Sequence, residues 1–396
     1  MNRRITQAQS HARLLLDASV PLVGGAKTPL DAIVVPTARP ASALQPVINL
    51  SVEVGVPLVI LCSRQARLAQ VVGRVEKTFG AQALVIQVDG YQPRCMKPLT
   101  SAEEFQIASA GRSSDLSAKR NIGLLLGRLR GWNKILFLDD DLYGFNTQDV
   151  SRLSGYLDNY PVASLRSWKY PDNSVVCHAR RRVGFKQDVF VSGAALGVNL
   201  QHPDQSFFAD IYNEDWFFFA RHAARRRLPN IGKVSQQSYE PFADPQRAAR
   251  EEFGDLLAEG LYLAFHGRGS VDEHLADALK PRLWEEFKEA RLETIQQTAE
   301  ELERVEKWLD HSEYDDIKNS LRTANEWAET ITPDLCVNFI DSWQEDERSW
   351  QLMLSNFPSK LNNRDALAEL ELSDWTLCGY GLSDSSQSYL APAGAV

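Results

Sequence analysis

The chain has 396 residues, 44% hydrophobic and 24% charged, so it can bury a large core without disulfide bonds. Its formal net charge of −9 argues against a surface dominated by nucleic-acid binding. The five cysteines are scattered, without the close spacing of a zinc or redox motif. No run approaches the roughly 20 apolar residues of a transmembrane helix, and no signal-peptide core is present. We therefore expect a cytoplasmic protein with no nucleic-acid partner and no transmembrane segment.

The first third of the chain alternates strand-like with helix-like segments. Four apolar runs predict buried strands, at 31–36, 56–62, 83–88 and 134–138. The segments between them have helical spacing, and a capped helix over 117–130 leads into the fourth strand. This alternation is typical of βαβ units, so we expect an α/β fold with a mostly parallel, Rossmann-like sheet flanked by helices.

The pattern changes further along the chain. Residues 189–200 predict a strand pair around Gly193, and 214–227 predict a helix. Helical periodicity with many charged residues then begins near 275. We divide the chain into a catalytic domain (1–274), a helical C-terminal region (275–380) and a tail (381–396) expected to be flexible. The helical region either packs on the catalytic domain or forms a homodimer contact.

Three aspartates, Asp139, Asp140 and Asp141, follow the fourth predicted strand directly. Ligands of open α/β sheets bind beyond the carboxyl ends of the strands. A bend there would turn Asp139 and Asp141, two residues apart, toward one ion. Carboxylate oxygens suit Mg²⁺ or Mn²⁺, which in turn would hold a diphosphate. The alternative is a solvated acidic turn or a set of helix-capping carboxylates.

Two further pairs of charged residues are candidates for chemistry. Glu214 and Asp215 open an aromatic-rich helix, where one carboxylate with a raised pKa would be a usable general base. Alternatively, both simply interact favourably with the helix dipole. Lys119 and Arg120 precede the strand that carries the aspartates, and near a metal they would neutralise a leaving diphosphate. Alternatively, Lys119 and Arg120 are ordinary solvent-exposed residues of a helix.

In chain order, these pieces resemble the GT-A glycosyltransferases, and among them the inverting family 2. Ile33–Thr37 followed by Arg39–Pro40 is similar to that family's opening strand and its "P-T-x-N-R" turn, where the nucleotide base is held. Ser117–Gly123 resembles the "A-x-R-N-x-G" helix, and Leu136–Asp141 matches the metal-binding D-x-D at the end of its strand.

Two more segments extend this resemblance over roughly residues 30 to 270. Ser192–Ala195 resembles the glycine-containing segment on the acceptor side, and Asn213–Asp215 is similar to the "E-D" motif that carries the catalytic base. The sequence departs from the family at Cys62–Arg64, where an acidic residue for the base is usual, and Asp89 is the candidate replacement. His266 is the best-placed candidate for a late third metal ligand.

The resemblance implies a nucleotide-diphosphate sugar bound at the carboxyl edge of the sheet, with Mn²⁺ or Mg²⁺ bridging Asp141 and the diphosphate. Asp215 would remove the proton of an acceptor hydroxyl that attacks the anomeric carbon from the opposite face, with Glu214 beside it. The expected donor-binding residues are Pro36, Thr37, Arg39, Asp89, Lys119, Arg120, Asp139 and Asp140, and the expected metal ligands are Asp141, Asp139 and His266.

The acceptor is not identified by the sequence. Arg180–Arg182 suggest an acceptor with a phosphate or carboxylate group. Trp168, Tyr170, Tyr212 and Trp216 are candidates for stacking on a sugar or an aromatic acceptor. The alternative for all of them is ordinary surface charge or core.

Four other functions remain open. A retaining GT-A enzyme shares the D-x-D, and there Glu214 and Asp215 would only orient the substrates. A haloacid-dehalogenase-type phosphohydrolase also places D-x-D after a strand, but normally after the first one. A nucleotidyltransferase usually has a glycine-rich loop after its first strand, and Pro36–Pro40 contains no glycine. A non-catalytic binding or assembly protein would use the acidic helical region as its partner surface.

Overall fold

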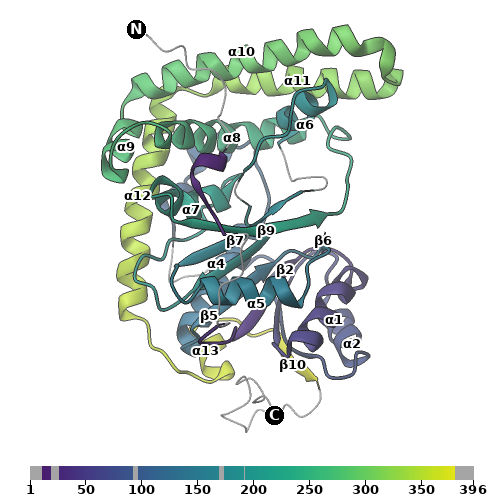
Figure 1. The fold of residues 1–396 in the computed structure, drawn as a ribbon, viewed down its shortest axis with the longest axis vertical. Coiled ribbons are helices and arrows are strands. Elements are labelled where there is room, and N and C mark those ends of the chain that lie inside the picture. The colour runs from purple at the N-terminus through teal and green to yellow at the C-terminus, as the bar shows by residue number, and fades with distance from the viewer. Residues whose placement is uncertain (1–10, 19–25, 92–96, 169–173, 191, 380–396) are drawn as a thin grey trace.

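The computed structural model describes residues 11–18, 26–91, 97–168, 174–190 and 192–379. Its centre is a mixed, mostly parallel ten-stranded sheet with helices on both faces (Figure 1). Nine strands follow one another in the order β1 (Leu15–Asp17), β9 (Leu228–Gln236), β7 (Val162–Ser167), β8 (Ala195–Asn199), β5 (Lys134–Leu138), β2 (Ala32–Thr37), β3 (Leu58–Cys62), β4 (Gln82–Gln87) and β10 (Trp375–Gly379). The tenth, β6 (Leu142–Tyr143), pairs with β9.

Helices cover the sheet because successive residues of its central strands face opposite sides. In β2, Ile33 and Val35 pack with α1 (Gln45–Val54), α2 (Leu68–Glu76) and α5 (Thr147–Tyr156). Ala32 and Val34 belong to the core on the other face. That face carries α3 (Glu103–Ala108), α4 (Leu116–Arg130), α7 (Glu214–Ala224) and α8 (Gln246–Phe265).

The predicted α/β alternation is confirmed for the first part of the chain. The four predicted strands are β2, β3, β4 and β5, and these four strands are mutually parallel. The predicted strand pair around Gly193 is wrong. In the described part of 189–200 the chain forms one strand, β8, whose antiparallel partners are β5 and β7.

Residues beyond 270 are mostly helical, as expected. The helices are α9 (Val271–Ala278), α10 (Pro281–Val305), α11 (His311–Thr330), α12 (Pro333–Asn356) and α13 (Asn363–Glu369), and α6 (Val175–Arg182) lies against α11. Short 3-10 turns occur at His11–Arg13, Ala41–Leu44, Leu99–Ser101 and Glu306–Trp308. None of the helices in the described ranges combines the length and the apolar character that crossing a bilayer requires.

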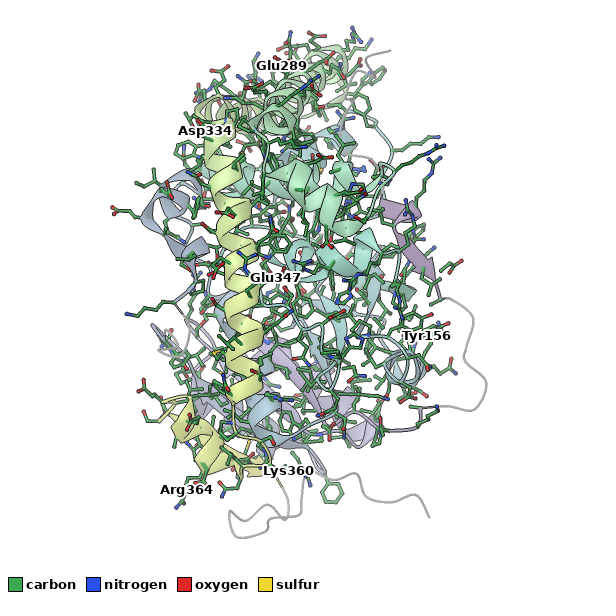
Figure 2. All side chains as sticks on the ribbon, turned by 90° about the vertical axis from the view of Figure 1, so that its left-hand side faces the viewer. Tyr156, Glu289, Asp334, Glu347, Lys360 and Arg364 are labelled. Carbon is green, nitrogen blue, oxygen red and sulfur yellow. The ribbon has the colours of Figure 1, made fainter. Side chains whose placement is uncertain are left out.

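The C-terminal helices share a core with the sheet. Trp284 on α10 and Trp343 on α12 belong to the same buried cluster as Val34 of β2. Figure 2 shows α12 along one side of the molecule, and the buried Glu347 near its middle accepts from Ser206 (2.8 Å) and Arg221 (2.8 Å). The division at residue 274 stays a prediction, and the expected tail lies outside the described residues.

One buried guanidinium joins α10 to α8. Arg291, 3% exposed, donates to Glu252 (2.8 and 2.9 Å), Asp255 (2.7 Å) and Glu259 (3.1 Å). All three carboxylates are buried as well, and they raise the pKa of Arg291. A buried charge is destabilising unless a group of opposite charge lies next to it. Arg291 and the three carboxylates must therefore stay together, and this fixes α10 against α8.

We expect Arg291→Met to lower the free energy of unfolding by about 3–5 kcal/mol, because three buried carboxylates lose their cation. Urea unfolding followed by circular dichroism measures the change. Arg282→Met on the same helix is the matched control, since Arg282 is exposed and pairs with the half-exposed Glu286. If the urea midpoint of Arg291→Met equals that of Arg282→Met, Arg291 does not stabilise the fold.

Candidate active site

Asp139, Asp140 and Asp141 lie at the carboxyl end of β5, beside the end of β2. Because β2 and β5 are parallel neighbours, their last residues meet at one edge of the sheet. Thr37, the final residue of β2, donates from its hydroxyl to Asp140 Oδ2 at 2.5 Å. Arg39, two residues on, lies 3.6 Å from Asp140 and 3.5 Å from Asp141. The two segments expected to bind the donor are therefore in contact.

Arg120 of α4 holds the first aspartate. Its guanidinium, 2% exposed, donates to both carboxylate oxygens of Asp139 at 3.1 Å and to Glu214 of α7 at 2.7 Å. Burial raises the pKa of Asp139 and Arg120 opposes that rise, while Asp139 and Glu214 keep the guanidinium charged. Since Asp139 gives both oxygens to Arg120, the other two aspartates are better placed to meet a metal.

Asp141 has a buried oxygen that accepts no hydrogen bond from the described residues. Its Oδ2 accepts from Gln236 Nε2 at 3.0 Å, but its Oδ1 and the Oε1 of Gln236 are both buried without a partner. Leaving such oxygens unsatisfied costs about 1–3 kcal/mol each. Hard oxygen donors suit Mg²⁺ and Mn²⁺, so this pair fits a divalent cation. Nothing in the sequence marked Gln236, which reaches Asp141 only through the pairing of β9 with β6.

A cavity of about 390 Å³ opens beside Thr37 and Asp140. The basic residues on its wall outnumber the acidic ones: Arg39, Arg64, Arg112, Lys119 and Arg250 face Asp115 and Asp140. Such a wall favours an anionic ligand. Pro36, Thr37, Arg39, Lys119 and Asp140, all predicted donor residues, are brought together here.

Lys119 is held by three neighbouring groups at the wall of this cavity. The Nζ atom donates to the Thr37 carbonyl (2.8 Å) and to Ser63 (2.6 Å), and it lies 3.0 Å from Asp115. Burial lowers its pKa. With three neighbours around one ammonium group, Lys119 ties the ends of β2 and β3 to the start of α4 and shapes the cavity wall.

Two predicted residues lie apart from this edge. Asp89 is an exposed acceptor for the Arg64 backbone N–H (2.8 Å), a bond that lowers its pKa, and Asp89 itself is not part of the described cavity wall. His266 follows α8, where burial and the charges of Arg226 and Arg13 lower its pKa. Among the described contacts, none joins His266 to Asp139, Asp140 or Asp141, and its Nε2 is buried without a partner.

Asp215 lies in a second cavity of about 390 Å³, which shares Arg112 and Leu116 with the first. The Asp215 carboxylate accepts from the backbone N–H groups of Gly193 (2.6 Å) and Trp216 (2.9 Å). A Cβ at Gly193 would lie 2.8 Å from Arg120 Nη1 and 2.8 Å from Asp215 Cβ. The predicted glycine segment thus allows the base candidate and Arg120 to approach each other.

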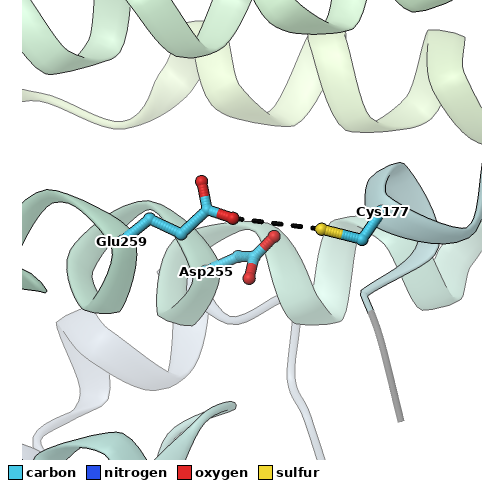
Figure 3. A group of neighbouring side chains, drawn as sticks. All are labelled: Cys177, Asp255 and Glu259. Carbon is cyan, nitrogen blue, oxygen red and sulfur yellow. Dashed lines mark hydrogen bonds between the residues drawn. The ribbon is translucent and has the colours of Figure 1, made fainter. Parts of the chain in front are cut away.

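Cys177, Asp255 and Glu259 form one wall of this second cavity (Figure 3). Their potential ligand atoms lie within 4.8 Å of one another, as in a metal site. The two carboxylates already bind Arg291, and the Cys177 thiol donates to Glu259 at 4.0 Å. Burial raises the pKa of the thiol and of Glu259. Arg291 supplies the cation of this cluster, which therefore serves as structure.

The predicted acceptor residues are divided between this cavity and other surroundings. Trp168, Tyr212 and Trp216 line the cavity, and Tyr170 lies outside the described residues. Arg180–Arg182 are absent from its described wall. Arg180 donates to Thr298 (3.4 Å), and Arg182 pairs with Glu313 on α11.

No protein-family model matches this chain, and no curated protein matches it. Among solved structures, the chain is similar to the mannosyltransferase PcManGT from Pyrobaculum calidifontis in complex with GDP-Man and Mn²⁺. The identity is 10% and the TM-score 0.36, with 85% of this chain and 92% of that chain covered. At this TM-score the likeness decides nothing about activity, which has to be inferred from the residues of this chain.

We expect Gly193→Ala to lower the free energy of unfolding by about 1–3 kcal/mol, because the added methyl group displaces Arg120 or Asp215. Gly73→Ala is the matched control. Gly73 lies within α2, a Cβ there meets nothing within 4 Å, and helix propensity predicts a gain of up to about 1 kcal/mol. Urea unfolding of both variants measures the difference, and equal gains would contradict a crowded site.

Proposed function

We propose that the protein is a metal-dependent glycosyltransferase of the GT-A type, which moves a sugar from a nucleotide-diphosphate sugar to an acceptor hydroxyl. One observation carries the proposal: the basic cavity beside Thr37 and Asp140 and the second cavity, which contains Asp215, share part of their walls. Both lie at the carboxyl edge of the sheet, and Asp141 lies beside the basic cavity. The basic cavity suits a diphosphate, and the second suits an acceptor hydroxyl.

The donor diphosphate would lie in the basic cavity, beside Arg39 and Asp140. Asp141 and Gln236 offer the unpartnered oxygens for Mn²⁺ or Mg²⁺, with Asp140 next to them. When bound, the metal supplies positive charge to the leaving diphosphate. Arg39 is half-buried at the cavity, and its guanidinium would add charge-assisted hydrogen bonds to the phosphate oxygens.

Asp215 is the residue that we assign as general base. Two backbone N–H donors hold its carboxylate at the wall of the acceptor cavity, where it would take the proton of the attacking hydroxyl. Glu214 differs, because Arg120 at 2.7 Å and Arg112 at 3.7 Å already engage its oxygens. We assign Glu214 a positioning role and propose direct displacement with inversion, as in family 2.

Donor binding is tested by the melting temperature with UDP-, GDP-, ADP- and TDP-sugars, each with and without Mn²⁺. A ligand at about 100 times its Kd stabilises the folded state by about 2.7 kcal/mol. We expect one nucleotide to stabilise the wild type only with Mn²⁺, and Asp141→Ala to lose this stabilisation. Asp277→Asn, on the exposed surface, should respond like the wild type. If none of these donors raises the melting temperature, with or without Mn²⁺, the proposal is contradicted.

The base is tested by turnover of the donor identified in this way, with sugar acceptors or with water as the acceptor. We expect Asp215→Asn to lower kcat by about 10²–10⁴-fold while the donor still stabilises the protein. Asp277→Asn is again the control. Full turnover of Asp215→Asn would exclude the base role, and retention of the donor's anomeric configuration in the product would exclude inversion.

A further inference from the structure

Two basic side chains and an exposed indole lie together at the mouth of the acceptor cavity. Arg166 and Trp168 belong to the cavity wall, and Lys233 of β9 is the register partner of Arg166 on β7. The Lys233 Nζ atom lies 3.5 Å from the centre of a Trp168 ring, and the Arg166 guanidinium carbon lies 5.7 Å from it. Trp168 is 56% exposed, which is unusual for so large an apolar side chain.

Neither cation is neutralised within the described ranges. Arg166 and Lys233 form no ion pair and no side-chain hydrogen bond there, and the Nε of Arg166 is buried without a partner. The other two basic residues of the cavity differ. Arg120 binds Asp139 and Glu214, and Arg112 lies 3.4 Å from Asp210. The mouth therefore carries positive charge that is not paired within the part of the chain that the structure describes.

Four carboxylates of the same cavity already have partners within the protein. Asp215, Glu214, Asp255 and Glu259 line it, and Arg120, Arg112 and Arg291 are all engaged by these or neighbouring carboxylates. An anionic group on a ligand would therefore be attracted to Arg166 and Lys233, whose charges are not paired within the described ranges. The cavity thus orients a ligand that has an anionic group at one end and hydroxyl groups at the other.

We propose that Arg166 and Lys233 bind an anionic group, a phosphate or carboxylate, of the acceptor, and that Trp168 packs against the sugar ring next to it. That the ligand is the acceptor rests on the proposed function, whereas the anion site itself rests only on these side chains. The cavity volume of about 390 Å³ falls in the range of small-molecule sites. Arg166 does not belong to the described wall of the donor cavity, which has basic residues of its own.

The site is tested by ¹⁹F NMR of protein labelled with 5-fluorotryptophan, titrated with glucose 6-phosphate at constant ionic strength without nucleotide or metal. The chain has nine tryptophans, and Trp168→Phe identifies the Trp168 signal. We expect a saturable shift of this signal with glucose 6-phosphate and no shift with glucose. The double variant Arg166→Gln, Lys233→Gln should raise the Kd at least tenfold, because both cations contact the phosphate.

The matched control is Lys280→Gln with Arg282→Gln, which removes two exposed charges elsewhere and should leave the Kd unchanged. Three outcomes would overturn the proposal. The first is a Trp168 signal that shifts as much with glucose as with glucose 6-phosphate. The second is a Kd for glucose 6-phosphate that is unchanged in the double variant. The third is a Trp168 signal that shifts with GDP or UDP, with a Kd as low as the Kd for glucose 6-phosphate. Phosphate binding without any donor stabilisation would leave the anion site in place and contradict the glycosyltransferase instead.

Discussion

The geometry of the site depends on one buried guanidinium, that of Arg120. It joins three elements, because it starts from α4, binds Asp139 after β5 and binds Glu214 at the start of α7. Burying a charged group is costly unless its partners are well placed, so the two carboxylates cannot move independently. Gly193 completes this arrangement, since any larger side chain would collide with Arg120 and Asp215. Asp139 and the start of α7, which carries Asp215, are therefore fixed relative to each other through Arg120.

Arg291 is a second buried arginine that joins separate elements, and it connects the C-terminal helices to the site. It binds Asp255, whose other oxygen accepts from Asn213 at 3.0 Å. Asn213 has a left-handed backbone (φ 63°) and comes directly before Glu214 and Asp215. A side chain of α10 thus supports the turn that places the base candidate. The helical region contributes to the site through this chain of contacts and through the core that it shares with the sheet.

The sequence was sufficient for the part of the site that depends on local patterns. Apolar runs mark β2 and β5, and parallel neighbours bring Thr37 and Asp140 together. It was insufficient where a role depends on distant pairing. Gln236 and Arg166 are ordinary polar residues until β9 pairs with β6 and β7. The roles expected for His266 and Arg180–Arg182 stay predictions, because residue type alone does not reveal which side chains reach a cavity.

The distribution of charge across the two cavities matches the movement of charge in the proposed reaction. Negative charge would develop on the departing diphosphate, beside Arg39 and the proposed metal ligands, while the acceptor proton would move to Asp215 in the second cavity. A phosphohydrolase would instead need an aspartate with a free oxygen as nucleophile. Both oxygens of Asp139 bind Arg120, Asp140 is held by Thr37 and Arg39, and the unpartnered Oδ1 of Asp141 is buried, out of reach of a substrate in either cavity. These contacts suit carboxylates that position a ligand and its metal, and they favour glycosyl transfer over attack by an aspartate.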